Sequence, residues 1–343
     1  MEANGIEARR AAARGERVHG PIDAATAAAA AQARMAGLLA RAADEPPREL
    51  QLHAAAIAAR SLSFAKELAR ICDAFRAAGV PLLALKGPVA SQQLYGDLTL
   101  RSFADVDVIA EDAVRGEAIL RDLGYDDGLT AAQRATKHRF HNGTAFSSKT
   151  TQTTIDFHWR FGHVQFPLAL AFGDAWERRS EVSLAGTTVA TLGLTDLALF
   201  TCSHAAKHFW TPFETLAQIA ALTRLPIDWE TLDSLAVSAR AARQVGLSFL
   251  VAREMVGCEL PPLPRCLAAS RAPFDALRVT LPAERDAGGR DLFLILDRRR
   301  DALAAMAASI FVPTDADWSA ATLPAPLYWL TRPWRLAAAR LRR

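Results

Sequence analysis

Apolar residues recur every three or four positions along much of the chain, and this spacing predicts helices. The clearest stretch runs from Leu50 to Ala78 and stops at Gly79, a residue type that commonly ends helices. A short, wholly apolar run from Val80 to Leu85 follows, which predicts a strand buried on both faces. Beyond it, the pattern predicts a helix over 88–95, a strand over 105–110 and a helix over 113–123.

Alternating polar and apolar residues predict two hairpins further along. The first pairs 139–147 with 151–159, and the second pairs 181–185 with 187–192 about Gly186. From Leu194 onward nearly all of the chain has helical spacing. We therefore predict an α+β fold in which a small mixed β-sheet core is flanked by helices and followed by a helical C-terminal domain.

The ends of the chain differ in character from this core. Residues 1–48 are rich in alanine and arginine and offer little apolar surface, so we expect a helical or disordered arm that is loosely attached. Residues 49–193 carry the sheet and its N-terminal helices, and 194–343 form the helical domain. Its basic C-terminal end, from Trp329 onward, predicts a helix that caps this domain; the alternative is a helix lying on an anionic membrane surface.

Composition bears on the partners of the protein, its compartment and the state of its cysteines. The chain has 343 residues, a net charge of +3 and an even scatter of acidic and basic positions, which does not favour a nucleic-acid partner. No apolar run approaches the roughly 18 residues that span a bilayer, and the first residues lack a secretory pattern, so we expect a cytoplasmic protein without an integral membrane segment. We expect free, buried thiols at Cys72, Cys202, Cys258 and Cys266.

Lysine is scarce in this chain, although basic residues are not. Of 40 basic residues only five are lysine, so a retained lysine marks a position that needs a compact ammonium group. Lys137 is one of them; it could reach a phosphate from a helix end, although a solvated side chain is the simpler interpretation. The five are Lys66, Lys86, Lys137, Lys149 and Lys207.

Three carboxylates form the main candidate site. Asp105 and Asp107 alternate on one predicted strand, so both side chains should project from the same face. Asp156 lies in a second predicted strand and could complete the group. Paired carboxylates favour a hard cation, which predicts an Mg²⁺ (or Mn²⁺) site; exposed acids that merely cap the next helix are the alternative. Lys86, ahead of Gly87, and Arg101 lie nearby in sequence and suit a polyphosphate ligand.

Histidines suggest further contacts with a substrate. His158 follows Asp156 by two residues and should face the same side of its strand. His204 and His208 are one helical turn apart, with Lys207 beside them, so all three could point into one cleft. The same histidine spacing suits zinc, which leaves a zinc hydrolase as an alternative, and packed histidines between two domains are a further one.

In order along the chain, these motifs resemble the uncharacterised bacterial nucleotidyltransferase family, which is similar to the polymerase-β-like nucleotidyltransferase superfamily. The resemblance implies a sheet that carries metal-binding carboxylates and a helical domain that helps to close over the substrate. It implies transfer of a nucleotide from an NTP to a small-molecule, glycan or peptide acceptor, in the biosynthesis of surface polysaccharide or modified peptides. The motifs are Leu85-Lys86-Gly87, Leu94-Tyr95-Gly96-Asp97, Arg101, Asp105-Val106-Asp107-Val108, Leu123-Gly124-Tyr125, Ile155-Asp156-Phe157-His158-Trp159, His204-Ala205-Ala206-Lys207-His208-Phe209-Trp210 and Leu327-Tyr328-Trp329-Leu330-Thr331-Arg332-Pro333.

The sequence departs from that pattern at two places. Lys86-Gly87-Pro88 stands where the superfamily has Gly-Ser or Gly-Gly for binding the triphosphate. Gln218 stands where the family tends to carry an acid after its histidine motif. A non-catalytic nucleotide-binding or scaffold protein of a biosynthetic cluster is therefore the alternative to an enzyme.

Overall fold

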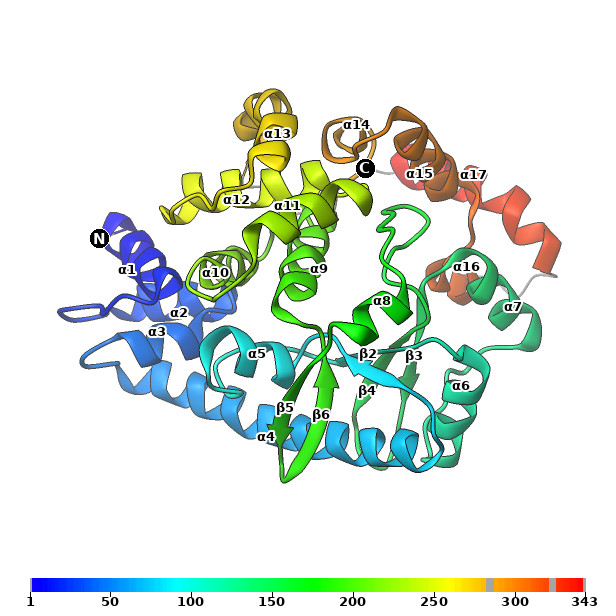
Figure 1. The fold of residues 1–343 in the computed structure, drawn as a ribbon, viewed down its shortest axis with the longest axis horizontal. Helices are drawn as coiled ribbons and strands as arrows, with labels where there is room; N and C mark the ends of the chain where they lie inside the picture. Colours follow the sequence, from blue (N-terminus) through cyan, green and yellow to red (C-terminus); the bar gives the residue numbers. More distant parts are fainter. Residues whose placement is uncertain (1, 282–286, 321–324, 342–343) are drawn as a thin grey trace.

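The computed structural model describes residues 2–281, 287–320 and 325–341, and its centre is a six-stranded mixed sheet (Figure 1). The strand order is β3-β4-β2-β1-β6-β5. In the middle of the sheet β2 runs parallel to β4 and β1 runs parallel to β6, while the remaining neighbours are antiparallel. The strands are β1 (Leu82–Ala84), β2 (Val106–Ala110), β3 (Gly143–Ser147), β4 (Thr154–His158), β5 (Ser180–Leu184) and β6 (Thr187–Thr191).

The two faces of the sheet contact different cores, because successive side chains of a strand point to opposite sides. On one face, Val106 and Val108 pack under the long helix α4 (Arg48–Ala77). On the other face, Ile109 joins the core of the helical domain. Asp107 belongs to this second face, so the alternation that buries the valines also directs the carboxylate towards the helical domain. The predicted α+β architecture is confirmed.

Helices surround the sheet and make up most of the second half of the chain (Figure 1). Helix α4 lies along the sheet on one side, and α9 and α10 lie on the other. The helices between the strands are α5 (Pro88–Tyr95), α6 (Ala113–Asp122), α7 (Ala131–Phe140) and α8 (Phe172–Glu177). Those after the sheet are α9 (Leu194–Lys207), α10 (Phe213–Leu222), α11 (Trp229–Ser238), α12 (Ala242–Val256), α13 (Pro264–Leu277), a short 3₁₀ turn (Arg278–Thr280), α14 (Asp291–Ile295), α15 (Arg299–Phe311), α16 (Asp315–Ala320) and α17 (Ala325–Leu341).

The expectation of a loosely attached N-terminal arm is wrong. Helices α1 (Glu2–Arg14), α2 (Ala24–Gln32) and α3 (Ala36–Ala42) form a compact group, and α1 packs against α10 and α12. Ala13 is only 1% exposed, because alanine lets helices approach closely without losing side-chain entropy. Arg10 and Arg14 donate hydrogen bonds to the carbonyls of Met255 and Val256, at 2.8 and 2.7 Å. These arginines donate to the last carbonyls of α12 and so attach α1 to the helical domain through polar contacts. A count of apolar residues does not predict such contacts.

Helix α7 replaces the start of the first predicted hairpin. Residues 139–140 belong to this helix rather than to a strand, and β3 begins only at Gly143. The helix starts with a capping box, in which the Thr130 hydroxyl accepts from the Gln133 amide and the Gln133 side chain accepts from the Thr130 amide. That signal was visible in the sequence and outweighs the β propensity of the residues that follow.

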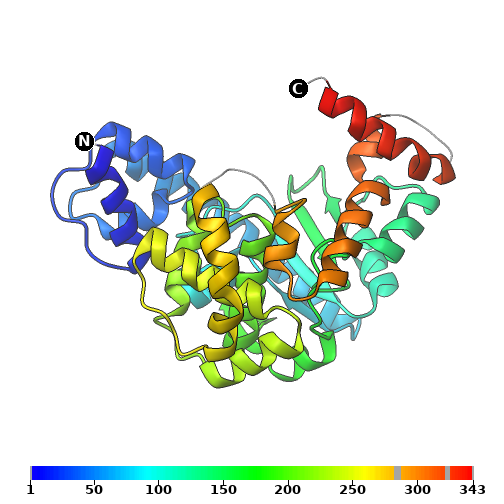
Figure 2. The ribbon, with the colours of Figure 1, turned by 90° about the horizontal axis from the view of Figure 1, so that it is seen from above.

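The C-terminal helices lie at the opposite end of the molecule from the N-terminal group (Figures 1 and 2). Helix α17 packs against α15 and α16. Arg332 and Arg335 of α17 both pair with the buried Asp317 of α16. Among the described residues, none of the helices combines the length and the apolar character needed to cross a bilayer. All four cysteines are free and buried, as predicted.

Candidate active site

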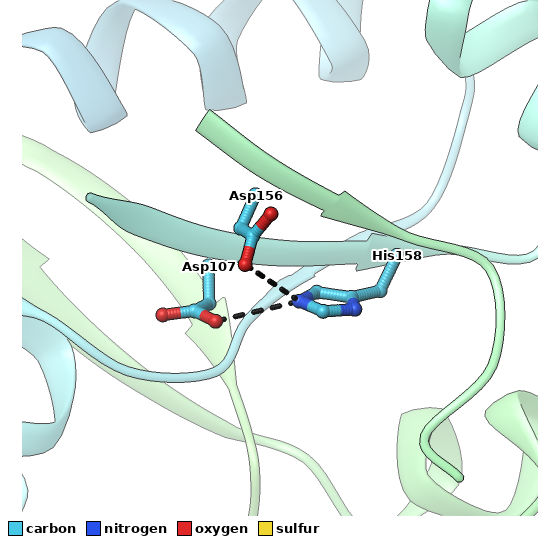
Figure 3. A group of neighbouring side chains, drawn as sticks. All are labelled: Asp107, Asp156 and His158. Carbon is cyan, nitrogen blue, oxygen red and sulfur yellow. Dashed lines mark hydrogen bonds and ion pairs between the residues drawn. The ribbon is translucent and has the colours of Figure 1, made fainter. Parts of the chain in front are cut away.

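Two carboxylates meet where parallel strands β2 and β4 lie side by side. Asp107 and Asp156 are direct partners in the register of these strands, and both point to the same face (Figure 3). With His158 they form a group whose possible ligand atoms all lie within 4.8 Å of one another. The convergence expected from the sequence is therefore present for this pair.

Asp107 is nearly fully buried and holds two hydrogen-bond donors. Its Oδ1 lies 2.7 Å from Nζ of Lys86 and 3.3 Å from Nε2 of His158. Burial alone would raise the pKa of this carboxyl group, but the Lys86 ammonium and His158 outweigh burial and hold the pKa well below its ordinary value. Asp107 is thus a carboxylate at neutral pH. In this ion pair the positive charge of Lys86 offsets the negative charge of Asp107 and so reduces its repulsion of the neighbouring carboxylates.

Asp105 lies one residue before β2 and is partly buried. Burial raises the pKa of its carboxyl group, and the nearby charges of Asp107 and Asp156 raise it further. The three carboxylates therefore repel one another, and a bound cation would relieve that repulsion, although Asp105 lies outside the close group of Asp107, Asp156 and His158.

His158 is held in one orientation by its two ring nitrogens. The side-chain amide of Asn142 donates to Nδ1 at 3.1 Å, so Nδ1 acts as the acceptor. The proton of a neutral ring then lies on Nε2, which points to Asp107 at 3.3 Å and to Asp156 at 3.9 Å (Figure 3). In this tautomer His158 positions the carboxylates as a donor, and its Nε2 has no lone pair left for a metal.

A cavity of about 630 Å³ opens in front of these carboxylates, between the sheet and the helical domain. Elements far apart in the sequence contribute to its wall, including β2, β4, α9 and α10 and the segment that leads into α16. The structure brings together every candidate residue predicted from the sequence, since all of them line this cavity. They are Lys86, Gly87, Arg101, Asp105, Asp107, Asp156, His158, His204, Lys207 and His208.

His204 and His208 pack edge to face at the cavity wall, with ring centroids 4.6 Å apart and an angle of 62° between the ring planes. Burial, reinforced by the charges of Lys86 and His208, lowers the pKa of His204 well below its ordinary value, so its ring is neutral. Within the described part of the chain, Asp107, Asp156 and His158 form the single group of three or more side chains of metal-ligand type that lie close together. The zinc alternative centred on His204 and His208 therefore has no third ligand there.

The sequence matches a family described as uncharacterised nucleotidyltransferase over residues 23–257, more than half of the chain. The chain belongs to this family. It is thus an enzyme of the nucleotidyltransferase class, as its motifs predicted. No curated protein has a significantly similar sequence.

Two solved structures are similar to part of the chain. ANT(2″)-Ia, crystallised with adenylyl-2″-tobramycin, is 19% identical, with a TM-score of 0.35 over 51% of this chain and 96% of its own. An antigenic nucleotidyltransferase-like protein from Paracoccidioides brasiliensis is 10% identical, with a TM-score of 0.34 over 59% of this chain and 95% of its own.

Arg101 of the nucleotidyltransferase, which the sequence predicted to neutralise phosphate charge, is buried and paired with a carboxylate of the protein. Its Nε is 2.7 Å from Oε1 of Glu214 on α10, and both side chains are less than 10% exposed. Gln218 donates to the other Glu214 oxygen at 2.8 Å. The sequence did not single out Glu214, although it lies one helical turn before Gln218, where the family's acid was expected. One buried nitrogen of Arg101, Nη1, has no hydrogen-bond partner among the described residues.

Lys137 and three neighbours also line the cavity of the nucleotidyltransferase. Lys137 is only 6% exposed, so the interpretation as a solvated lysine is wrong. The scarcity of lysine was the signal that could have identified it. The neighbours that sequence reasoning missed are His141, His163 and Asp315.

Proposed function

We propose that the enzyme transfers a nucleotide from an NTP to a hydroxyl or phosphate acceptor bound in the cavity between sheet and helical domain. The observation that carries the proposal is the juxtaposition of Asp107 and Asp156 on parallel strands, facing a cavity of about 630 Å³. A cavity of this size suits a nucleotide together with part of an acceptor. We expect the acceptor to be a small molecule, a glycan or a peptide, in surface polysaccharide or modified peptide biosynthesis.

The carboxylates fit a divalent metal of the Mg²⁺ type. Asp105, Asp107 and Asp156 offer oxygen ligands, and burial, followed by the negative charges of Asp107 and Asp156, raises the pKa of Asp105. Because Nε2 of His158 carries its proton, the donor set is oxygen-rich, which favours Mg²⁺ or Mn²⁺ over zinc. A bound metal would neutralise phosphate charge and lower the pKa of an acceptor hydroxyl.

The enzyme's own residues would prepare this site. His158, held by Asn142, orients the carboxylate of Asp107, and Lys86 neutralises that carboxylate until the substrate arrives. Gly87 has a φ of +67° at the start of α5, a backbone conformation that favours glycine. Because the chain turns at Gly87, Lys86 lies at the cavity just after β1, and α5 begins at the next residue, Pro88. We propose nucleotide contacts at Lys86, Gly87 and Arg101.

The helical domain would close the other side of the cavity. His204, Lys207 and His208 of α9 and its C-cap face the carboxylates across the cavity, and we propose that they contact the nucleotide or the acceptor. Since His204 is neutral, its contribution would be a hydrogen bond rather than a charge.

The proposal is tested by thermal unfolding with each of the four common NTPs in the presence of Mg²⁺. A ligand at a hundred times its Kd stabilises the native state by about 2.7 kcal/mol, so one NTP at least should raise the Tm. Asp156→Asn should abolish the increase, while Asp73→Asn, on the exposed side of α4, should retain it. An equal increase in wild type and Asp156→Asn would refute the proposed site.

A further inference from the structure

Lys137 is a buried lysine whose partner is exposed. Its Nζ lies 2.8 Å from Oδ2 of Asp315, and the two side chains are 7% and 68% exposed. The ammonium also lies 5.6 Å from the centre of the Trp318 ring. Asp315 lies beyond residue 257, where the family match ends, so this pairing is added by the C-terminal segment. A buried ammonium with an exposed carboxylate as partner can exchange that carboxylate for another anion.

Two neutral histidines adjoin Lys137 and fix the cavity wall. His141 Nε2 lies 2.9 Å from the Pro313 carbonyl, so Nε2 must donate and Nδ1 must accept. His163 Nε2 donates to that Nδ1 at 3.3 Å, while its own Nδ1 accepts from the Gln165 amide at 3.1 Å. Every ring nitrogen thus has a defined role, and both rings are uncharged.

The charge of Lys137 acts on both histidines. Burial lowers the pKa of His163 to about 3, and the charges of Lys207 and Lys137 are the next causes, with His141 between them. Burial and the charge of Lys137 likewise lower the pKa of His141, against a smaller opposing contribution of Asp315. The charge of Lys137 thus acts on both histidines, and Asp315 is its carboxylate partner.

Asp315 can leave Lys137 without loss of the surrounding fold. Helix α16 is anchored independently through Asp317, which accepts from the Thr314 amide at 2.8 Å and from the arginines of α17. The Pro313 carbonyl anchors the chain on the other side of Asp315. Release therefore needs only a rotation of the Asp315 side chain into solvent.

We propose that Lys137, beside the His141–His163 pair, forms a subsite for an anionic group of a substrate, a phosphate or a carboxylate, and that Asp315 occupies this subsite as an internal substitute for the anion. The subsite itself is independent of the proposed function. Its assignment to a substrate rests on that function, and the anion belongs either to the phosphates of the NTP or to an anionic acceptor.

Calorimetric titration with inorganic phosphate at low ionic strength tests the subsite in metal-free protein. Asp315→Asn should bind phosphate about tenfold more tightly than wild type, because the internal competitor is removed. Lys137→Met, which keeps the length of the side chain, should weaken binding by about 10-fold to 100-fold, as expected for loss of a charge-assisted hydrogen bond. Lys149→Met, at an exposed lysine, is the matched control and should bind as wild type.

Opposite changes in the two variants cannot arise from misfolding. Equal phosphate affinity in wild type and Lys137→Met, or no gain in Asp315→Asn, would overturn the proposal. A second titration, with Mg²⁺ and a non-hydrolysable NTP at saturation, identifies the source of the anion. Phosphate binding that persists assigns the subsite to the acceptor, and phosphate binding that is lost assigns it to the NTP. Because the first titration needs no nucleotide, a failure of the subsite is distinguishable from a failure of NTP binding.

Discussion

At the scale of single residues, the environment of Asp107 governs the site. The sequence predicted Lys86, Asp107 and Asp156 as neighbours because strand alternation fixes which side chains share a face. It could not predict that Asn142 sets the tautomer of His158, because Asn142 reaches the ring across the pairing of β3 with β4. Contacts between residues on different strands depend on register, which the sequence pattern fixes only approximately.

Lys86→Ala tests what the lysine does in the empty enzyme. Because its ammonium lies 2.7 Å from the buried Asp107 carboxylate, we expect the metal-free variant to lose about 1–3 kcal/mol of unfolding free energy in urea. Saturating Mg²⁺ should remove most of the difference, since the cation replaces the lost charge. Lys66→Ala, on the exposed face of α4, serves as the control. Unchanged stability together with weaker NTP binding would instead show that Lys86 acts on the phosphate alone.

Asp105→Asn tests the repulsion among the carboxylates. The folded protein raises the pKa of Asp105 above its ordinary value of 3.8, so the charged form destabilises the fold. This penalty is complete above the folded pKa and disappears as the pH falls below 3.8. Metal-free Asp105→Asn should therefore be more stable than wild type at pH 7, on the order of 1 kcal/mol, and equally stable at the acidic limit. A variant that is less stable at pH 7 would contradict the account; urea unfolding across the pH range measures the difference.

At the scale of elements, the sequence predicted most strands and helices, but it did not predict which of them pack against each other. Both hairpins and helix α5 are present, because turn residues and apolar spacing mark them locally. The ion pair of Arg101 with Glu214 joins the segment before β2 to α10 across 113 positions, and no local pattern indicates it.

Glu214→Gln tests this link between sheet and helical domain. The variant leaves the buried Arg101 charge without its partner, so we expect a loss of about 3–5 kcal/mol of unfolding free energy. Asp73→Asn, which breaks the exposed pair of Asp73 with Arg76, should cost less than about 1 kcal/mol. Similar losses in the two variants, measured by chemical denaturation, would show that the buried pair does not hold the elements together.

At the scale of the whole molecule, the cavity exists because segments from both ends of the chain complete it. Arg34, from the N-terminal segment that the sequence presented as a loose arm, lines the cavity, and so does Asp315 near the C-terminus. The alanine-rich helices looked poor in core-forming surface, yet alanine packs closely when other helices supply the apolar area. The alanine-rich composition therefore did not indicate that the N-terminal segment contributes a residue, Arg34, to the cavity.

The central claim, that Asp105, Asp107 and Asp156 hold a divalent cation for the NTP, is tested most directly by titrating Mn²⁺ and following the free ion by electron paramagnetic resonance. Wild type should bind Mn²⁺ more tightly when an NTP is present, and Asp107→Asn and Asp156→Asn should each lose about 1.5–3 kcal/mol of this binding or more. Asp73→Asn, on the exposed side of α4, should retain it. Mn²⁺ binding that survives in Asp107→Asn, or that disappears in Asp73→Asn, would contradict the account.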